Sequence, residues 1–427
     1  MSRLQNSLFV LVMVMSMESV TATVASADQA FNGNTTFNGN VWMQGPEPWV
    51  DVKAYGAKGD GSTNDAGAIQ NAINSLPFAG GTVFFPGGSY YVHSTVTIST
   101  SQVNVVLRGA GAGGWGNSPQ GTSELITDQE INILQVGGTS STSLGGPRIY
   151  NLGFRDISSS GVALGAIQMN RIRHFLLEDV NCGEFTNGYC VTLDGTNDFV
   201  EYGDFIKLNA RDVKTGVRMV NGVGQITFYG GHITSSLVSG SIGLDLEGEP
   251  GSGRIGNVVV YNTALESFSI GIKAYNTQLC RFQVKIENTG DSSYHTGTGI
   301  LIDSTDADDA RSNSVMGSSI DGPAIGIQVN PNAAESSIMG NTIVDTPTAN
   351  ISNSGQGTLI LAQNRLEPGS AAWADNVTHS GSGAQASWTT GSGSPGGSCV
   401  TGSLYTNTNS SATSVLYVCQ NGNWVGK

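Results

Sequence analysis

Seven short segments of the chain begin with a glycine and then place apolar residues at alternate positions. The segments start 23 to 28 residues apart, at Gly165, Gly188, Gly216, Gly243, Gly271, Gly299 and Gly326. Alternation of this kind predicts a strand with one buried face. A nearly constant interval between such strands is the sequence signature of a solenoid. A second apolar segment lies between successive glycine segments, so we expect a stack of β coils with at least two strands in each coil.

Residues 50–98 depart from this pattern, because their middle part has the period of a helix. Four apolar residues fall at positions i, i+3, i+4 and i+7 and form one stripe: Ile69, Ala72, Ile73 and Leu76. Thr63 or Asn64 can cap this helix, and Pro77 ends it. A single amphipathic helix before a β solenoid would cover the open apolar end of the stack.

The same block resembles the N-terminal region of pectate lyase superfamily proteins. The matching segments are YGAKGDGSTND at 55–65, AIQNAI at 68–73 and GGTVFFP at 80–86. This superfamily includes rhamnogalacturonase-like and epimerase-like proteins and many phage tailspikes. The resemblance implies a right-handed parallel β-helix, but it leaves the reaction open because one fold serves lyases, hydrolases and non-catalytic proteins.

We therefore expect an all-β chain, namely a right-handed parallel β-helix with an N-terminal capping helix and a small C-terminal β module. Arg3, an apolar run at 8–15 and the small residues at 25–27 favour a cleaved export signal and a secreted protein. The expected divisions are a signal peptide at 1–27, an N-terminal arm at 28–49, the β-helix at 50–368, a Gly/Ser-rich linker at 369–398 and a stapled hairpin at 399–427.

Charge and cysteine content narrow the partners and the compartment. The net charge of −14 would repel nucleic acid, and it weighs against a highly acidic glycan unless a cation bridges the two. Cys399 and Cys419 flank the C-terminal module and are the first disulfide candidates, with Cys182 and Cys190 as a second pair. Cys280 is then left over, and we expect it to be buried.

The repeat strands predict two exposed columns of side chains, at the second and fourth residues after each glycine. The first column contains Arg218, Asp245 and Lys273, and the second contains Glu247, Tyr275 and Asp303. Paired carboxylates a few ångströms apart are what acid/base cleavage of a glycosidic bond requires. We therefore expect Asp245, Glu247 and Asp303 to be catalytic, whereas Tyr275, Lys273 and Arg218 bind the sugar. The alternative is a solvated face on which stacked opposite charges stabilise modestly.

Two further acidic groups are candidates for chemistry. Glu266 and Glu287, with Asp321, each follow an apolar residue and can share one position in three consecutive coils. Mutual repulsion there would suit a general acid, and the same stack could equally bind a cation. The segment 303–311 offers Asp306, Asp308 and Asp309 as oxygen ligands for calcium, although it lacks the spacing of a calcium-loop motif and a solvated loop is the alternative. With calcium bound, a lyase would be favoured and Arg254, Arg281 and Arg311 would be the bases to test. His232 is a lone histidine, for which a core or turn role is expected.

The sequence thus predicts a secreted protein that acts on a pectin-like or other cell-surface polysaccharide, as a glycoside hydrolase or a polysaccharide lyase. The alternative is a non-catalytic, tailspike-like protein that binds glycan or mediates adhesion. No cofactor is required by this chemistry, with calcium as the one alternative. We expect a monomer or a homotrimer, and no nucleic-acid partner.

Overall fold

A computed structural model describes the chain from Trp49 onward, with gaps. The described residues are 49–99, 102–113, 122–137, 144–196, 198–235, 237–288, 295–306, 309–360, 364–366, 377–379, 388–397, 399, 401–409 and 415–427. The expected signal peptide and almost all of the expected arm lie outside them. Across the ranges given above, no helix is long and apolar enough to cross a membrane.

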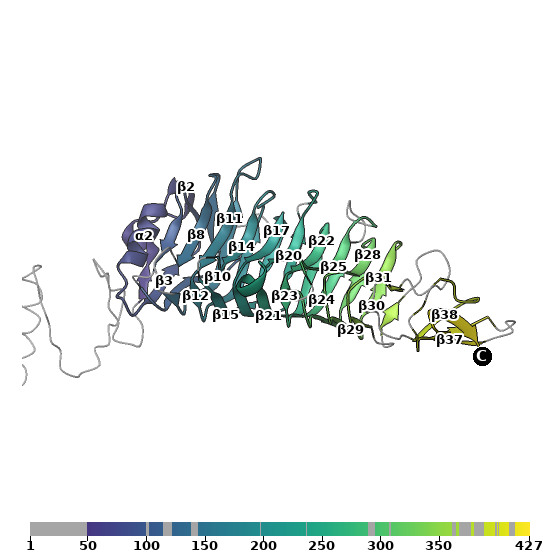
Figure 1. Cartoon of the computed structure of the whole chain (residues 1–427). Coiled ribbons are helices and arrows are strands. Elements are labelled where there is room, and N and C mark those ends of the chain that lie inside the picture. The colour runs from purple at the N-terminus through teal and green to yellow at the C-terminus, as the bar shows by residue number, and fades with distance from the viewer. Residues whose placement is uncertain are drawn as a thin grey trace, which may run out of the picture. The chain divides into compact units, whose positions relative to one another are not determined.

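The described strands of the solenoid pair in parallel, each with the equivalent strand of the next coil (Figure 1). These strands form two large sheets, named the first and the second sheet. The second sheet takes one strand from each coil. Its strands are β5 (Val96–Ile98), β8 (Asn132–Gly137), β11 (Gly165–Asn170), β14 (Tyr189–Asp194), β17 (Thr215–Val220), β20 (Ile242–Glu247), β22 (Ile270–Tyr275), β25 (Thr298–Asp303), β28 (Ile325–Val329), β31 (Ala349–Asn353) and β34 (Val377–His379). This architecture confirms the expected parallel β-helix.

The first sheet takes the remaining strands of every coil and wraps around the other sides of the core. Its early strands are β1 (Trp49–Asp51), β2 (Asp60–Asn64), β3 (Gly81–Phe85), β4 (Gly88–Tyr91), β6 (Val105–Gly109), β7 (Ser123–Thr127), β9 (Leu144–Gly145), β10 (Arg148–Asp156), β12 (Ile172–Arg173), β13 (Leu176–Gly183), β15 (Val200–Ile206) and β16 (Asn209–Val213). Its later strands are β18 (Val223–Tyr229), β19 (His232–Ser235), β21 (Ile255–Glu266), β23 (Thr277–Gln278), β24 (Arg281–Glu287), β26 (Ser314–Met316), β27 (Ser319–Asp321), β29 (Ser337–Met339), β30 (Thr342–Val344), β32 (Leu359–Ile360) and β33 (Arg365–Leu366).

The core is a set of apolar ladders that run from coil to coil. In β22, Ile272 and Ala274 are buried whereas Lys273 and Tyr275 point outward, as alternation predicts. On the first sheet the ring of Phe205 stacks on that of Phe228, with centroids 4.5 Å apart. Because equivalent side chains repeat at the spacing of neighbouring strands, each coil buries the apolar face of the next.

The glycines recur because a side chain at their position would clash with the backbone of the next coil. The strand pairing also shows that five of the seven predicted glycines share one column, and that the other two do not. A Cβ on Gly271 would lie 2.6 Å from the carbonyl oxygen of Gly299 in the next coil. Four other glycines share this column and its crowding: Gly216, Gly243, Gly299 and Gly326. Gly165 and Gly188 do not, because the strand pairing places Ala166 and Cys190 at the level of Gly216.

The predicted helix is α2 (Ala66–Asn74), which buries Ile69 and Ile73 against the first coils. It follows a short 3₁₀ turn, η1 (Val52–Tyr55). Asn64 accepts a hydrogen bond from the Ala66 N–H at 3.2 Å, as a cap does. The buried carboxylate of Asp65 instead accepts the N–H groups of residues 58 and 59 at 2.7 and 2.9 Å, and so fixes the loop before the helix.

A third, four-stranded sheet forms the C-terminal module. Its strands are β35 (Trp388–Gly391), β36 (Leu404–Asn407), β37 (Leu416–Gln420) and β38 (Asn423–Gly426). The antiparallel pair β36–β37 is the predicted hairpin. Both β34 and β35 lie within 369–398, which the sequence assigned to a linker, so this segment contains two strands.

Both predicted disulfides are present. Cys399 is bonded to Cys419 in the C-terminal module, and Cys182 is bonded to Cys190 between the two large sheets. Cys280 is a buried free thiol, as expected.

Candidate active site on the second sheet

Three neighbouring strands of the second sheet bring the predicted columns together. The strand pairing places Arg218 of β17 beside Asp245 of β20, and Asp245 beside Lys273 of β22. It also places Glu247 of β20 beside Tyr275 of β22. The aligned glycines at 216, 243 and 271 predicted this register, and alternation predicted the face on which these side chains lie.

Four of these side chains form one network of opposite charges. Glu247 accepts a hydrogen bond from Arg218 Nη2 to Oε2 and another from Lys273 Nζ to Oε1, both at 2.7 Å. Asp245 lies farther from the same cations, with Lys273 Nζ 3.7 Å from Oδ1 and Arg218 Nε 3.9 Å from Oδ2. The two cations are thus hydrogen-bonded to Glu247, whereas they lie beyond hydrogen-bond distance from Asp245.

Asp245 has an unusual electrostatic position for an outward-facing residue. It is 6% exposed, and its Oδ1 accepts no hydrogen bond. Burial and the neighbouring Glu247 raise the pKa of Asp245 to about 6, although Lys273 and Arg218 oppose the shift. Burial would also raise the pKa of Glu247, but there Lys273 and Arg218 outweigh it and hold the pKa below its ordinary value. The pair therefore combines one carboxyl that exchanges protons near neutral pH with one that stays ionised.

Two tyrosines border the network. The Arg218 guanidinium lies 5.5 Å from the ring centroid of Tyr189 and donates a hydrogen bond to its hydroxyl at 3.3 Å. Lys273 Nζ lies 5.8 Å from the ring centroid of Tyr275. Sequence reasoning found Tyr275 but missed Tyr189, which lies one residue before the level of the glycine column and so outside both predicted columns.

Asp303, the third expected catalytic residue, stands apart from the network. It follows Tyr275 in the same column, on β25, two coils from Glu247. Its Oδ1 accepts the backbone N–H of Ser304 at 2.8 Å. A catalytic role for Asp303 stays a prediction.

The second acidic group also stacks as expected. Glu266 of β21 pairs with Glu287 of β24, which pairs with Asp321 of β27. His232 lies on the neighbouring strand with its Nε2 3.0 Å from Glu266 Oε2, so this half-buried histidine has a carboxylate neighbour. Lys285 is in turn the partner of Glu287.

The expected calcium ligands are placed in part. Asp309 is 2% exposed and accepts hydrogen bonds from Arg254 Nε at 2.7 Å and from the Gly251 N–H at 3.1 Å. It thereby fastens the loop that contains η2 (Gly251–Gly253). Asp306 is described, whereas Asp308 lies outside the described residues. Over the described part of the chain, no group of three or more acidic, histidine or cysteine side chains is arranged to hold a metal, and the calcium site stays a prediction.

Residues 49–136 match the family described as rhamnogalacturonase A/epimerase, pectate lyase-like. This segment is similar to that family, and the chain folds as a parallel β-helix. It is 35% identical over 113 residues to alginate lyase 7 and 35% identical over 116 residues to mannuronan C5-epimerase AlgE6, both of Azotobacter vinelandii. These alignments cover 22% and 26% of this chain, and 13% and 12% of the two relatives.

Solved structures share the fold at low sequence identity. The tailspike protein gp49 of Acinetobacter baumannii bacteriophage Fri1, a capsular polysaccharide depolymerase, gives a TM-score of 0.55 at 13% identity, over 78% of this chain and 62% of that chain. PfbA, a surface adhesin of Streptococcus pneumoniae, gives a TM-score of 0.52 at 13% identity, over 88% of this chain and 98% of that chain. Proteins that share this fold thus include one described as a capsular polysaccharide depolymerase and one described as an adhesin.

Proposed function

We propose that this protein is an extracellular polysaccharide-processing enzyme whose proton-transfer residue is Asp245. The observation that carries the proposal is the position of this buried carboxyl, held 3.7 and 3.9 Å from two cations and next to a second carboxylate. Enzymes that cleave sugar chains need neighbouring carboxyl groups whose environments drive their pKa values apart. Asp245 and Glu247 have that relationship.

The two cations favour a lyase over a hydrolase. Both oxygens of Glu247 are engaged by Arg218 and Lys273, so Glu247 is poorly placed to attack an anomeric carbon. Arg218 and Lys273 can instead exchange part of this contact for the carboxylate of a uronate residue. Neutralising that carboxylate acidifies the adjacent C–H, and Asp245 can take the proton. The electron pair then forms the C=C bond, the glycosidic C–O bond breaks, and the departing oxygen takes the proton from Asp245.

The names of the two curated relatives agree with uronate chemistry, since one is an alginate lyase and the other a mannuronan epimerase. Hydrolysis is the alternative reaction, with Asp245 as the general acid. The two reactions differ in the protonation state that they require. A base at Asp245 makes activity rise as pH increases through about 6, whereas an acid at Asp245 makes activity fall over the same range.

The test is a digest of a panel of uronate-rich and neutral polysaccharides, with and without calcium. New reducing ends report any cleavage, and ultraviolet absorbance reports unsaturated uronates. Asp245→Asn should lower kcat by about 10²–10⁴-fold, the usual contribution of a general acid or base. Asp204→Asn is the matched control, because Asp204 is an exposed carboxylate on the first sheet. Reducing ends without absorbance would overturn the lyase version, and cleavage by Asp245→Asn at the normal rate would overturn the site.

A non-catalytic adhesin is the second candidate. It is favoured by PfbA, because that adhesin aligns over nearly its whole length with most of this chain. An adhesin would bind a glycan without producing either signal. Asp245→Asn would then leave glycan binding unchanged and there would be no turnover to lose.

A further inference from the structure

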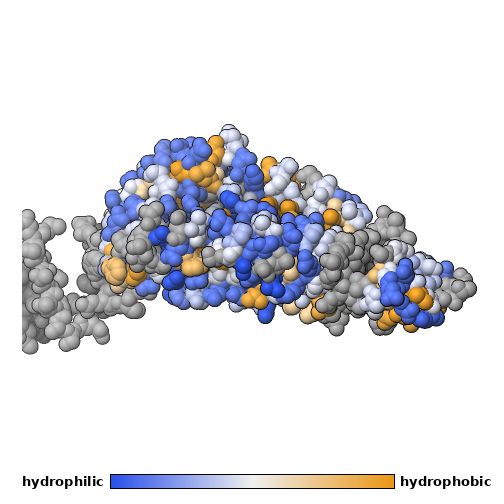
Figure 2. Space-filling model, in the orientation of Figure 1, coloured by the Kyte–Doolittle hydropathy of each residue, from blue (hydrophilic) through white to orange (hydrophobic). Residues whose placement is uncertain are grey.

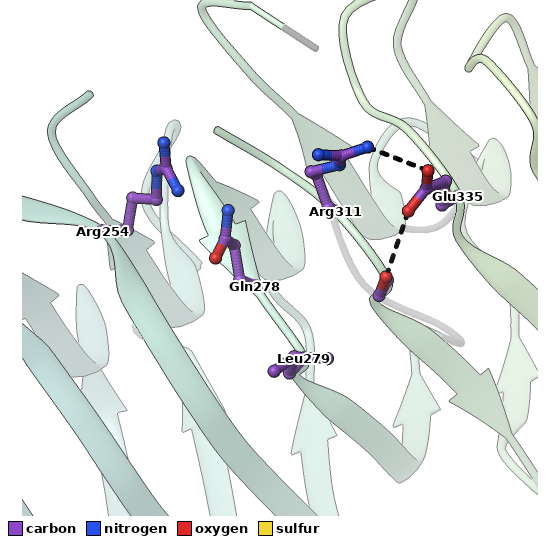
Figure 3. A pocket seen from close by; sticks show the side chains of 6 residues that line it. Arg254, Gln278, Leu279, Arg311 and Glu335 are labelled. Atoms are coloured by element: carbon purple, nitrogen blue, oxygen red, sulfur yellow. Dashed lines mark hydrogen bonds and ion pairs between the residues drawn. The ribbon is translucent and has the colours of Figure 1, made fainter. Parts of the chain in front are cut away.

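A groove follows the first sheet, away from the charged network on the second sheet. Its first part has a volume of about 660 Å³, and its lining includes Arg254, Gln278, Leu279 and Arg311 (Figure 3). A second part of about 650 Å³ shares Leu279 and Ser312 with the first, so the two are continuous. The second part crosses the face of β21, β24, β26, β29 and β32.

Three arginines line this groove in a protein whose net charge is −14. Figure 3 shows Gln278 between Arg254 and Arg311, with Arg311 joined to Glu335. Arg254 contacts Asp309 through Nε, and Arg281 is exposed on β24 in the second part. A guanidinium presents five N–H donors in a planar fork that matches a carboxylate, so these ion pairs do not exhaust its donors. Asp309 and Glu335 offset two of these charges, and Arg281 adds a third, so the groove presents guanidinium donors to an anionic ligand.

Apolar side chains complete the same surface. Met316, Met339 and Leu359 line the second part of the groove beside the arginines. On the face shown in Figure 2 the described surface is largely hydrophilic and its apolar residues form separate small patches. An apolar strip beside guanidinium groups suits a ligand that has both C–H faces and acidic groups, as the sugar rings of an acidic polysaccharide do.

Leu279 adds an independent observation. It occupies the left-handed backbone region, with φ 56°, and is 54% exposed at the junction of the two parts of the groove. The same corner is left-handed in the neighbouring coils, where Gln225, Asn257, Ser312 and Glu335 occupy it, so the fold sets this backbone conformation. Leu279 differs from them in placing an exposed apolar side chain there, which a ligand contact would explain.

We propose that this groove is a second binding site, which holds an acidic segment of the polysaccharide outside the charged network. It rests on the proposed function for the nature of the ligand, but it uses a different sheet and different residues. The uronate carboxylates lie against Arg281 and Arg254, and the ring faces lie against Leu279 and the methionines.

The test is equilibrium binding of a polyuronate to the full chain at fixed ionic strength, with a neutral glucan and a sulfated polysaccharide of similar length as comparison probes. Arg281→Gln removes a charge, and Leu279→Asn removes the apolar contact while relieving the strained backbone. Arg148→Gln is the matched control, because Arg148 is an exposed arginine of the first sheet that lies outside the groove.

Arg281→Gln and Leu279→Asn should each weaken polyuronate binding by about tenfold, whereas Arg148→Gln should bind as the wild type does. Leu279→Asn should also raise the melting temperature, whereas replacing a leucine that serves only to stabilise the fold would lower it. Equal affinity of the groove variants and the wild type would overturn the proposal, as would an equal loss in Arg148→Gln or a preference for the sulfated or neutral probe.

The same variants separate this proposal from the proposed function. Normal binding by the groove variants together with loss of turnover in Asp245→Asn would refute the second site and leave the enzyme intact. If the wild-type protein digests no polysaccharide but the groove variants lose binding, the second site would be supported and the proposed enzymatic function refuted.

Discussion

The pKa of Asp245 leads to a prediction about stability that needs no substrate. In the folded protein burial, together with repulsion by Glu247, raises this pKa from 3.8 to about 6, whereas in the unfolded chain it takes its ordinary value. The folded state then binds the proton more tightly than the unfolded state does. The contribution of protonated Asp245 is fully present below about pH 4 and is lost as pH rises through about 6.

The expected magnitude follows from the size of the shift. A rise of about two pKa units corresponds to about 3 kcal/mol in total, of which about 2 kcal/mol falls between about pH 4 and about pH 7.5. Asp245→Asn keeps the shape of the side chain and cannot ionise. The free energy of unfolding of the wild type, minus that of Asp245→Asn, should therefore fall by about 2 kcal/mol over this range.

Urea denaturation followed by tryptophan fluorescence at a series of pH values measures this difference. Taking the difference removes the contributions of the other titrating groups, which both proteins share. Lys273→Met should move the wild-type transition to higher pH, because Lys273 opposes the rise in the pKa of Asp245. A difference that stays constant with pH would show that Asp245 ionises in the folded protein as it does in water, and would remove the physical basis of the proposed site.

Three further predictions test the fold. Gly271→Ala should destabilise the protein by about 1–3 kcal/mol in thermal melts, because its Cβ would lie 2.6 Å from a carbonyl oxygen of the next coil. Gly67→Ala is the control and should be neutral or stabilising, because Gly67 lies in α2 with open space around it. Replacing both Cys399 and Cys419 by serine should cost the C-terminal module about 3 kcal/mol, since the loop they close spans 20 residues, and limited proteolysis should then cut within 399–427 first. Asp309→Asn should destabilise by about 1–3 kcal/mol by weakening a buried charged hydrogen bond, and an unchanged midpoint in urea would contradict the loop-fastening role.

The sequence by itself determined the repeating strand and the face that each residue occupies. Alternation fixes the face on which each side chain lies, and with the aligned glycines it placed Arg218, Asp245 and Lys273 in one outward-facing column, although packing then buried Asp245. The helix of residues 66–74 was equally predictable from its apolar stripe. These features are local, because they depend on the period of one strand or one helix.

Only the tertiary structure decided how neighbouring coils align and which charges meet. The glycine column excludes Gly165 and Gly188, since their coils differ in loop length and the pairing shifts by one or two residues. The contact of Asp309 with Arg254 and that of Glu266 with His232 join residues 55 and 34 positions apart, through loops whose path the repeat does not encode. Strand period can be read along the chain, but the burial of Asp245 depends on side chains from three coils, and so it exists only once the coils have stacked.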